Sequence, residues 1–138
     1  MIQIKSRKRV KDLGEVFTHQ REVEAMLNLL AVEVFENPLT TFLEPSCGTG
    51  NFLIEIIKRK INHNPDELSI LKSLSSIYGV DISLENVLEA RERIFSEVSF
   101  NLSEHSKEQA RVIIETNIIQ GDFLNEVIDF QEYKWESA

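Results

Sequence analysis

The stretch that most constrains the fold of this chain is residues 42–52, Phe-Leu-Glu-Pro-Ser-Cys-Gly-Thr-Gly-Asn-Phe. Its first two residues are typical of the end of a buried strand. Gly48 and Gly50 permit a tight turn and leave no Cβ to block a ligand that lies against the backbone. A helix over about residues 52–60 is expected to follow, with Asn51 as its cap. A strand, a glycine loop and a helix in this order predict a pocket for a nucleoside cofactor.

The spacing of the glycines separates this loop from two phosphate-binding motifs. No third glycine stands in the phosphate-binding position of a dinucleotide fingerprint, and no Gly-Lys-Ser or Gly-Lys-Thr follows as in a P-loop. The sequence therefore favours a ligand that lacks phosphates. The loop also holds the single cysteine, Cys47, which has no partner for an internal disulfide or a zinc site. A small side chain suits a close cofactor here, and a nucleophilic role stays open.

Two further stretches have the pattern of a buried strand that ends in an acid. Residues 77–82, Ile-Tyr-Gly-Val-Asp-Ile, contain Asp81, and residues 118–124, Ile-Ile-Gln-Gly-Asp-Phe-Leu, contain Asp122. With Glu44 after the first strand, each strand has an acid at its carboxyl end. Ligands of parallel α/β sheets bind at that edge, so we expect the three acids in one site. The carboxylate of the second strand would accept both ribose hydroxyls.

Two of these acids also have a simpler interpretation. Asp81 is a possible cap of the next helix, although Ser83 is better placed for that role, and Asp122 in a Gly-Asp pair is a common turn residue.

Gly50 and Asp81 are 31 positions apart (81 − 50 = 31), more than the roughly 20 of a minimal dinucleotide unit. A short extra helix over about residues 65–74, with its proline at the first helical position, accounts for the excess.

Strands and helices alternate along the chain, which predicts an α/β fold with a parallel sheet and right-handed crossovers. The strands are expected at about residues 41–44, 77–81 and 118–120. Helices are expected at about residues 20–35, 52–60 and 65–74, after the Ser83 cap, and at 108–116, with a loop over 99–108. Two helices have an apolar stripe of period 3.6, made of Val23, Met26, Leu27, Leu30 and Val34 in the first and Leu84, Val87, Leu88, Arg91 and Phe95 after Ser83.

Taken together, these segments resemble the class I methyltransferases that use S-adenosylmethionine (SAM). The form Glu-Pro-x-Cys-Gly-x-Gly-x-Phe is similar to the cofactor loop of the adenine-specific DNA methyltransferases of restriction-modification systems. Residues 14–19, Gly-Glu-Val-Phe-Thr-His, resemble the Gly-x-x-Phe-Thr-Pro segment of that family, with His19 where proline is usual. The resemblance spans about residues 14–124, most of the chain.

The resemblance implies SAM as the cofactor and assigns its contacts. The methionine end would lie near the glycine loop and Thr18, whose hydroxyl would meet the carboxylate. Thr18 is equally suited to be the N-cap of the following helix. The ribose would lie at Asp81, and the adenine beside Asp122 and Phe123. The full set of cofactor-binding residues is Phe17, Thr18, Glu44, Pro45, Ser46, Cys47, Gly48, Gly50, Asp81, Ile82, Asp122 and Phe123.

The catalytic segment of that family has no match in this sequence. In the family an Asn-Pro-Pro-Tyr segment holds the target amino group while the aromatic ring stacks on the extruded base. The prolines here, Pro38, Pro45 and Pro65, are not adjacent. We therefore assign no catalytic residue and expect the isolated chain to be inactive. We interpret residues 1–13 as a basic arm and 14–138 as the SAM-binding part of a Rossmann-like domain, truncated before that segment, with three strands in the order 3-2-1.

Other interpretations of the chain remain open. It is alternatively a SAM-binding module without catalysis, one piece of a split enzyme, or part of a methyltransferase that acts on protein glutamine or on RNA. In a truncated sheet the strand at 41–44 would form an open edge beside uncovered apolar surface. Such an edge favours self-association or a partner subunit.

The charge of the chain constrains its partners. Against 23 acidic residues stand 15 basic ones, a net charge of −8, which is the wrong sign for a surface that binds duplex DNA. The resemblance implies DNA contacts mainly through regions outside this chain, and the basic arm is the local exception. No metal-ligand cluster is visible. No apolar run approaches about 18 residues and the start lacks a secretory signal, so we expect no membrane contact and a cytoplasmic location.

Overall fold

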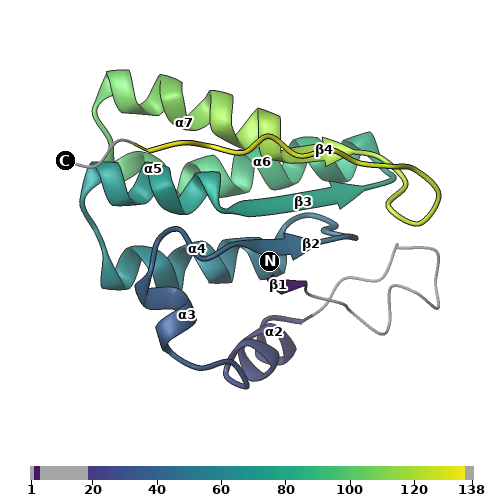
Figure 1. Cartoon of the computed structure of the whole chain (residues 1–138), viewed down its shortest axis with the longest axis horizontal. Coiled ribbons are helices and arrows are strands. Elements are labelled where there is room, and N and C mark those ends of the chain that lie inside the picture. The colour runs from purple at the N-terminus through teal and green to yellow at the C-terminus, as the bar shows by residue number, and fades with distance from the viewer. Residues whose placement is uncertain (1, 4–18, 136–138) are drawn as a thin grey trace.

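The three predicted strands form a parallel sheet in the predicted order. In the computed structural model, which describes residues 2–3 and 19–135, β2 (Phe42–Glu44) pairs with β3 (Ile77–Asp81), and β3 pairs with β4 (Ile118–Gln120). Figure 1 shows these strands side by side, with helices between them in the sequence. The fold is therefore α/β with parallel strands, which is compatible with part of a Rossmann-like fold.

A further strand, β1 (Ile2–Gln3), pairs in parallel with β2, so the expected open edge at residues 41–44 is wrong. The order β1-β2-β3-β4 places β2 inside the sheet. Backbone groups of an edge strand need partners, and two paired residues supply them here. A strand of two residues has no periodicity that a sequence can show. The remainder of the predicted basic arm lies outside the described residues.

The sheet has two different faces. Phe42, Ile77 and Ile118 point from one face into the main apolar core, which the helices complete. Tyr78 and Val80 are equally buried but belong to the opposite face, because successive strand residues alternate. The helices that follow the strands are α4 (Asn51–His63), α5 (Glu67–Ser75), α6 (Leu84–Val98) and α7 (Glu104–Asn117). Within the described residues, no helix has the length and apolar content needed to cross a membrane.

The first predicted helix, residues 20–35, is wrong as a continuous element. It is divided into α2 (Gln20–Leu27) and α3 (Glu33–Glu36). The turn between them brings Phe35 against the sheet, where its ring stacks on Phe42 with centroids 5.7 Å apart. The guanidinium of Arg59 lies 5.3 Å from the centroid of the same Phe35 ring. Both contacts are made by residues outside the predicted helix, and they outweigh the local preference for one straight helix.

Helix α6 begins as predicted but buries a different face. The Ser83 hydroxyl caps it by accepting a hydrogen bond from the Asn86 N–H (3.2 Å). Of the predicted stripe only Val87 is fully buried, whereas Leu84 and Leu88 are 48% and 50% exposed. The buried apolar face of the helix consists of Val87, Ala90, Ile94 and Val98, so it shares only Val87 with the predicted stripe.

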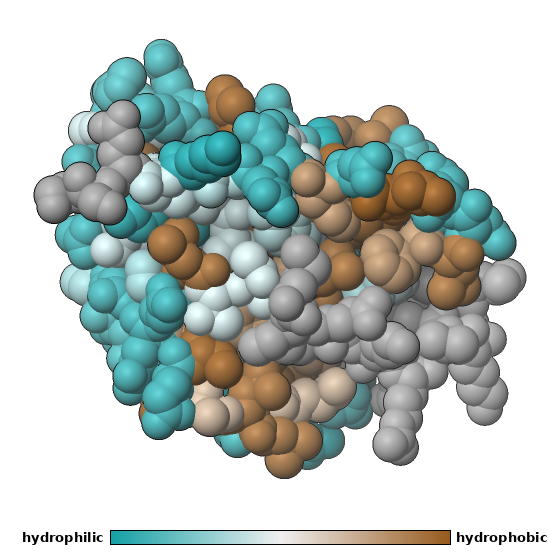
Figure 2. Space-filling model, viewed as in Figure 1, coloured by the Kyte–Doolittle hydropathy of each residue, from teal (hydrophilic) through white to brown (hydrophobic). Residues whose placement is uncertain are grey.

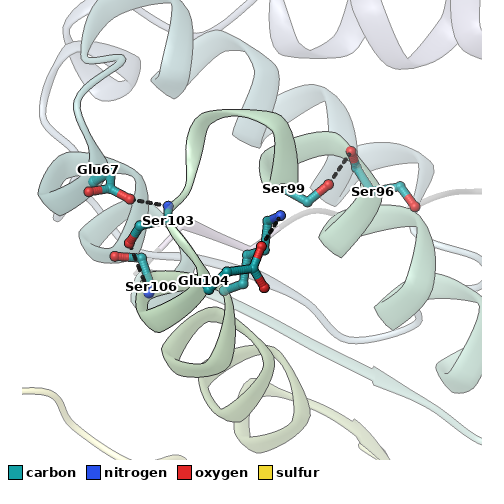
Figure 3. Close-up of polar contacts among 7 residues, drawn as sticks. Glu67, Ser96, Ser99, Ser103, Glu104 and Ser106 are labelled. Atoms are coloured by element: carbon teal, nitrogen blue, oxygen red, sulfur yellow. Dashed lines mark hydrogen bonds and ion pairs between the residues drawn. The ribbon is translucent and has the colours of Figure 1, made fainter.

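Helix α7 starts earlier than predicted, because its first turn is capped from another helix. A short 3-10 turn, η1 (Ser99–Asn101), and α7 replace the loop expected over residues 99–108. The Ser103 hydroxyl accepts from the Ser106 N–H (3.3 Å), and the Glu67 carboxylate of α5 accepts from the Ser103 N–H (Figure 3). Glu67 thus does what a glutamate of a local capping box would do. The hydrogen bonds between Ser103 and the Glu67 carboxylate lower the pKa of Glu67.

Helix α5 confirms the extra helix but begins two residues later than predicted. Asp66 is its N-cap and accepts from the Ser69 N–H (3.0 Å), so Pro65 lies before the helix rather than at its first position. The short carboxylate competes well for this N–H group, which has no partner within the helix.

The segment after β4 returns along the second face of the sheet, in front of it in Figure 1. The Tyr78 and Phe130 rings contact with centroids 4.9 Å apart, and the Tyr78 hydroxyl donates to the Gln131 carbonyl (3.1 Å). Nearer the amino ends of the strands, the Tyr133 hydroxyl donates to Asn117 Oδ1 (3.1 Å). This segment therefore covers part of the face that we expected to be uncovered.

Apolar side chains remain exposed at several places on the described surface, and two of these regions lie beside the sheet edges (Figure 2). Figure 2 shows them over α2 and α3 at the lower edge and beyond β4 at the right. The large exposed apolar residues of these two regions are Met26, Leu29, Val32, Leu39, Leu124 and Val127.

A buried lysine, Lys60 of α4, lies at the amino ends of β2 and β3. Its ammonium donates to the carbonyls of Pro38 (3.0 Å) and Thr40 and to the Ser76 hydroxyl, and it lies 5.3 Å from the centroid of the Phe42 ring. Burial opposes the charge that these acceptors favour, and it lowers the pKa of Lys60 to about 7.

We predict that the free energy of unfolding rises between pH 7 and pH 9. In this range the unfolded chain keeps a proton on Lys60 that the folded chain releases, so the gain is at most about 1.4 kcal/mol per pH unit. Urea unfolding as a function of pH measures it. Lys60→Met should be less stable by about 1–3 kcal/mol, because two carbonyls lose a donor, and should lack this rise. An equally steep rise in Lys60→Met would contradict the assignment.

Candidate functional site at the carboxyl ends of the strands

The loop between β2 and α4 makes the tight turn that the two glycines predict. Gly48 and Gly50 have φ values of 55° and 95°, in the left-handed region that a side chain disfavours. The Cys47 N–H donates to the Val80 carbonyl (2.8 Å), which fixes the loop to β3. Of the predicted loop residues, Cys47 is buried, while Pro45 and Ser46 are half-buried.

Asn51 is not the cap of α4, contrary to the prediction. Gly50 is the N-cap residue and has no side chain to accept a hydrogen bond, while Asn51 is already the first helical residue. The left-handed backbone at Gly50 turns the chain directly into the helix. A Cβ at Gly50 would lie 3.3 Å from the Ala90 Cβ of α6, so the glycine also permits close packing of α6 on the loop.

Gly79, in the middle of β3, is a residue whose role in this site we did not predict. A Cβ there would lie 2.8 Å from Leu53 Cδ1 and 3.1 Å from Cys47 Cβ. The missing side chain therefore lets α4 and the glycine loop lie directly on the strand. A lone glycine inside a strand pattern is the sequence signal that indicates such an approach.

Asp81 joins the glycine loop to the start of α6. Its carboxylate accepts from the Gly48 N–H through Oδ1 and from the Ser83 N–H and Asn86 Nδ2 through Oδ2, each at 3.0 Å. Asp81 is 5% exposed. Its backbone carbonyl also accepts from the Gly121 N–H (3.0 Å), which ties in the loop after β4. Asp81 thus holds the parts of the site in place, in addition to any contact with a ligand.

The strand register sets the three acids at successive levels along one edge. Glu44 lies level with Gly79, so Asp81 stands two residues further along, and Asp81 lies level with Gln120, two residues before Asp122. Two strand residues correspond to about 6–7 Å. Glu44 is buried, and its carboxylate accepts from the Ser46 N–H (3.0 Å). The acids therefore line the carboxyl end in steps.

Asp122 organises the turn after β4, which agrees with its interpretation as a turn residue of a Gly-Asp pair. Its carboxylate accepts from the Leu124 N–H (3.2 Å) and from Asn125 Nδ2 (2.7 Å). Asp122 and Phe123 are half-exposed, and Ile82 is 67% exposed. Unlike Asp81, these residues present much of their surface to solvent at this end of the sheet.

The predicted segment for the methionine end cannot be placed. Phe17 and Thr18 lie outside the described residues, and the exposed His19 is the first residue that follows them. His19 is the N-cap residue of α2, without a side-chain cap, so Thr18 is not that N-cap.

Arg93 of α6 is a contact of the loop that sequence reasoning missed. Its Nη1 donates to the Thr49 carbonyl (2.8 Å), the Thr49 hydroxyl (3.1 Å) and Asn51 Oδ1 (2.8 Å). In the sequence Arg93 belongs to a run of charges that indicates only a solvated helix face. No local pattern identifies a partner 42–44 residues away.

Two surface hollows of the described region lie elsewhere. One lies between α6 and α7 and includes Leu88, Phe95 and Arg111, and the other lies beside α2 and α3 and includes Phe35 and Arg59. Neither contains a predicted site residue, and neither has the arrangement of glycines and acids seen at the strand ends. We therefore base the site on the chemistry of that edge rather than on the hollows.

This edge fits a nucleoside better than a phosphate. Carboxylates accept hydrogen bonds, as ribose hydroxyls and an adenine amino group require, and they repel a phosphate. The left-handed backbone at the two glycines shapes the loop beside these acids. Comparisons of the chain with protein-family models, with curated proteins and with solved structures found no match. The α/β fold class and the geometry of the loop and acids therefore come from the structure alone.

We predict that Gly79→Ala lowers the free energy of unfolding by about 1–3 kcal/mol, because the added methyl group is forced against Leu53 and Cys47. Gly121→Ala is the matched control: its Cβ would meet the flexible end of Ile128 at 3.2 Å and Val80 Cγ1 at an ordinary contact distance of 3.4 Å. Urea unfolding of both variants measures the difference. Equal losses in the two variants would show that close packing at Gly79 is not required.

Proposed function

We propose that the carboxyl end of this sheet binds SAM and that the chain is the SAM-binding part of a DNA adenine methyltransferase. The observation that carries the proposal is the link between Gly48 and Asp81, in which the acid at the tip of β3 holds the N–H of the glycine loop (3.0 Å). It joins the loop and the acid that the resemblance assigns to one cofactor. The adenine target in DNA rests on the Glu-Pro-x-Cys-Gly-x-Gly-x-Phe form of the loop.

The residues of the chain would bind and orient the cofactor. Asp81 would meet the ribose with the acceptor capacity that its hydrogen bonds to Gly48, Ser83 and Asn86 leave, while it keeps Gly48 and α6 in register. Asp122 would accept from the adenine amino group, and Phe123 and Ile82 would cover the ring with apolar surface. When bound, SAM supplies an electrophilic methyl group on a sulfonium centre. The carboxylates at this edge favour such a cation electrostatically.

We predict that S-adenosylhomocysteine, the product of SAM, binds the chain and that Asp81→Ala weakens binding by about 1–3 kcal/mol. The loss has two physical causes: the ligand loses a charged hydrogen-bond acceptor, and the glycine loop loses the hydrogen bond from the Gly48 N–H to Asp81. Asp129→Ala, which changes an exposed acid of the loop after β4, should bind like the parent. Calorimetry measures the affinities, and equal affinity of Asp81→Ala and the parent would refute the role of Asp81.

We predict that the 138-residue chain binds SAM without methylating DNA. None of its residues matches the segment that holds the target amino group, so bound SAM has no positioned acceptor. Transfer of labelled methyl from SAM to DNA adenine, with SAM binding measured in the same samples, tests this. Methylated adenine made by the pure chain would show that other residues hold the target amino group.

The second candidate is a module that binds SAM for a partner chain, or part of a methyltransferase acting on RNA or on protein glutamine. The missing Asn-Pro-Pro-Tyr segment and the net charge of −8 favour it over a self-sufficient DNA enzyme. It predicts the same affinity for SAM, and it is separated from the first candidate by adding each acceptor class to the methyl-transfer assay.

A further inference from the structure

We propose that Arg93 is the positioning residue of the cofactor loop: from α6 it holds the loop in the conformation that binds SAM. The inference rests on the proposed function of the loop. The three acceptors of Arg93 Nη1 lie at Thr49 and Asn51, on either side of Gly50. The loop is thus held at the position where its backbone has the least intrinsic preference for one conformation.

The loop has no side-chain cap of its own, and Arg93, which only donates, does not provide one. It restrains the loop instead through the oxygens of Thr49 and Asn51. The first N–H groups of a helix have no partner within the helix, and the N-cap Gly50 offers no side chain. Glycine also loses more conformational entropy on ordering than any other residue. A hydrogen bond from a separate helix supplies the restraint that the local sequence lacks.

Helix α6 is placed to supply it. Ala90 packs against Gly50, and Arg93 follows three residues later, on the same side of the helix. Near its start, α6 also carries Asn86, which donates to the Asp81 carboxylate (3.0 Å). One rigid helix therefore contacts both the tip acid of β3 and the loop.

Hydrogen-bond geometry rather than helix electrostatics explains the position of Arg93. A cation beside the N-terminus of α4 opposes the helix dipole. One guanidinium nitrogen, Nη1, nevertheless lies within hydrogen-bond distance of three oxygens, the Thr49 carbonyl, the Thr49 hydroxyl and Asn51 Oδ1, which share its two N–H groups. A lysine, which is a point charge on a flexible stem, should replace it only in part.

Three variants of the full chain test the proposal: Arg93→Gln, Arg93→Lys and the control Arg111→Gln. Arg111 is also an exposed arginine with an ion pair, to Glu92 (3.3 Å), and with a ring contact, to Phe95 (3.7 Å), but it does not touch the loop. Two readouts are used: amide hydrogen exchange of residues 48–52 without ligand, and calorimetric affinity for S-adenosylhomocysteine.

In Arg93→Gln we expect the loop amides to exchange about tenfold faster and the affinity to fall about tenfold, since the lost hydrogen bonds favoured the ordered loop. The thermal midpoint should stay close to that of the parent. Arg93→Lys should recover part of both losses and also serves as the test variant if Arg93→Gln does not fold. Arg111→Gln should change neither readout.

The two proposals fail in different ways. Unchanged loop exchange in Arg93→Gln would overturn the role of Arg93, whatever the affinity. A parent chain that binds no S-adenosylhomocysteine would refute the proposed function and, with it, a cofactor role for Arg93. Faster loop exchange in that case would show a structural contact only.

Discussion

The candidate site depends on the buried carboxylate of Asp81. It accepts hydrogen bonds from the glycine loop through Gly48, and from the first residues of α6 through Ser83 and Asn86. A buried carboxylate is stable only when donors surround it, so the burial of Asp81 requires the loop and α6 to take these positions. The same residue therefore sets the geometry of the site and limits how far its parts can move apart.

The two ends of the sheet have opposite chemistry. At the amino ends, Lys60 donates to two carbonyls before β2 and to the Ser76 hydroxyl before β3, and Asn117 donates to the carbonyl of Ile77 (3.0 Å). At the carboxyl ends lie the acids Glu44, Asp81 and Asp122 and the loop with its two glycines. Buried cationic and amide side chains thus close one end of the fold, and the polar groups that remain for a ligand lie at the other. This division agrees with the general rule for parallel α/β sheets.

Much of this arrangement was predictable from local patterns, and the errors share one cause. The strands, their order, the two left-handed glycines and the Ser83 cap follow from apolar runs and from turn and cap chemistry. The break between α2 and α3, the buried face of α6 and the start of α7 do not, because each depends on a tertiary contact with a residue of another element. Phe42, Ala90 and Glu67 provide these contacts: a ring against Phe35, close packing at Gly50 and a cap at Ser103.

The sequence by itself determined which residues stand at the strand ends, because strand length and turn chemistry are local properties. It placed Glu44, Asp81 and Asp122 at one edge of a parallel sheet and two glycines in the loop between β2 and α4. Only the tertiary structure decided what these groups do there. It gave the carboxylate of Asp81 to Gly48, joined Arg93 to Thr49 and Asn51, and paired β1 with β2. Hydrogen bonds between residues more than 30 positions apart form only after the helices have packed, so no local pattern encodes them.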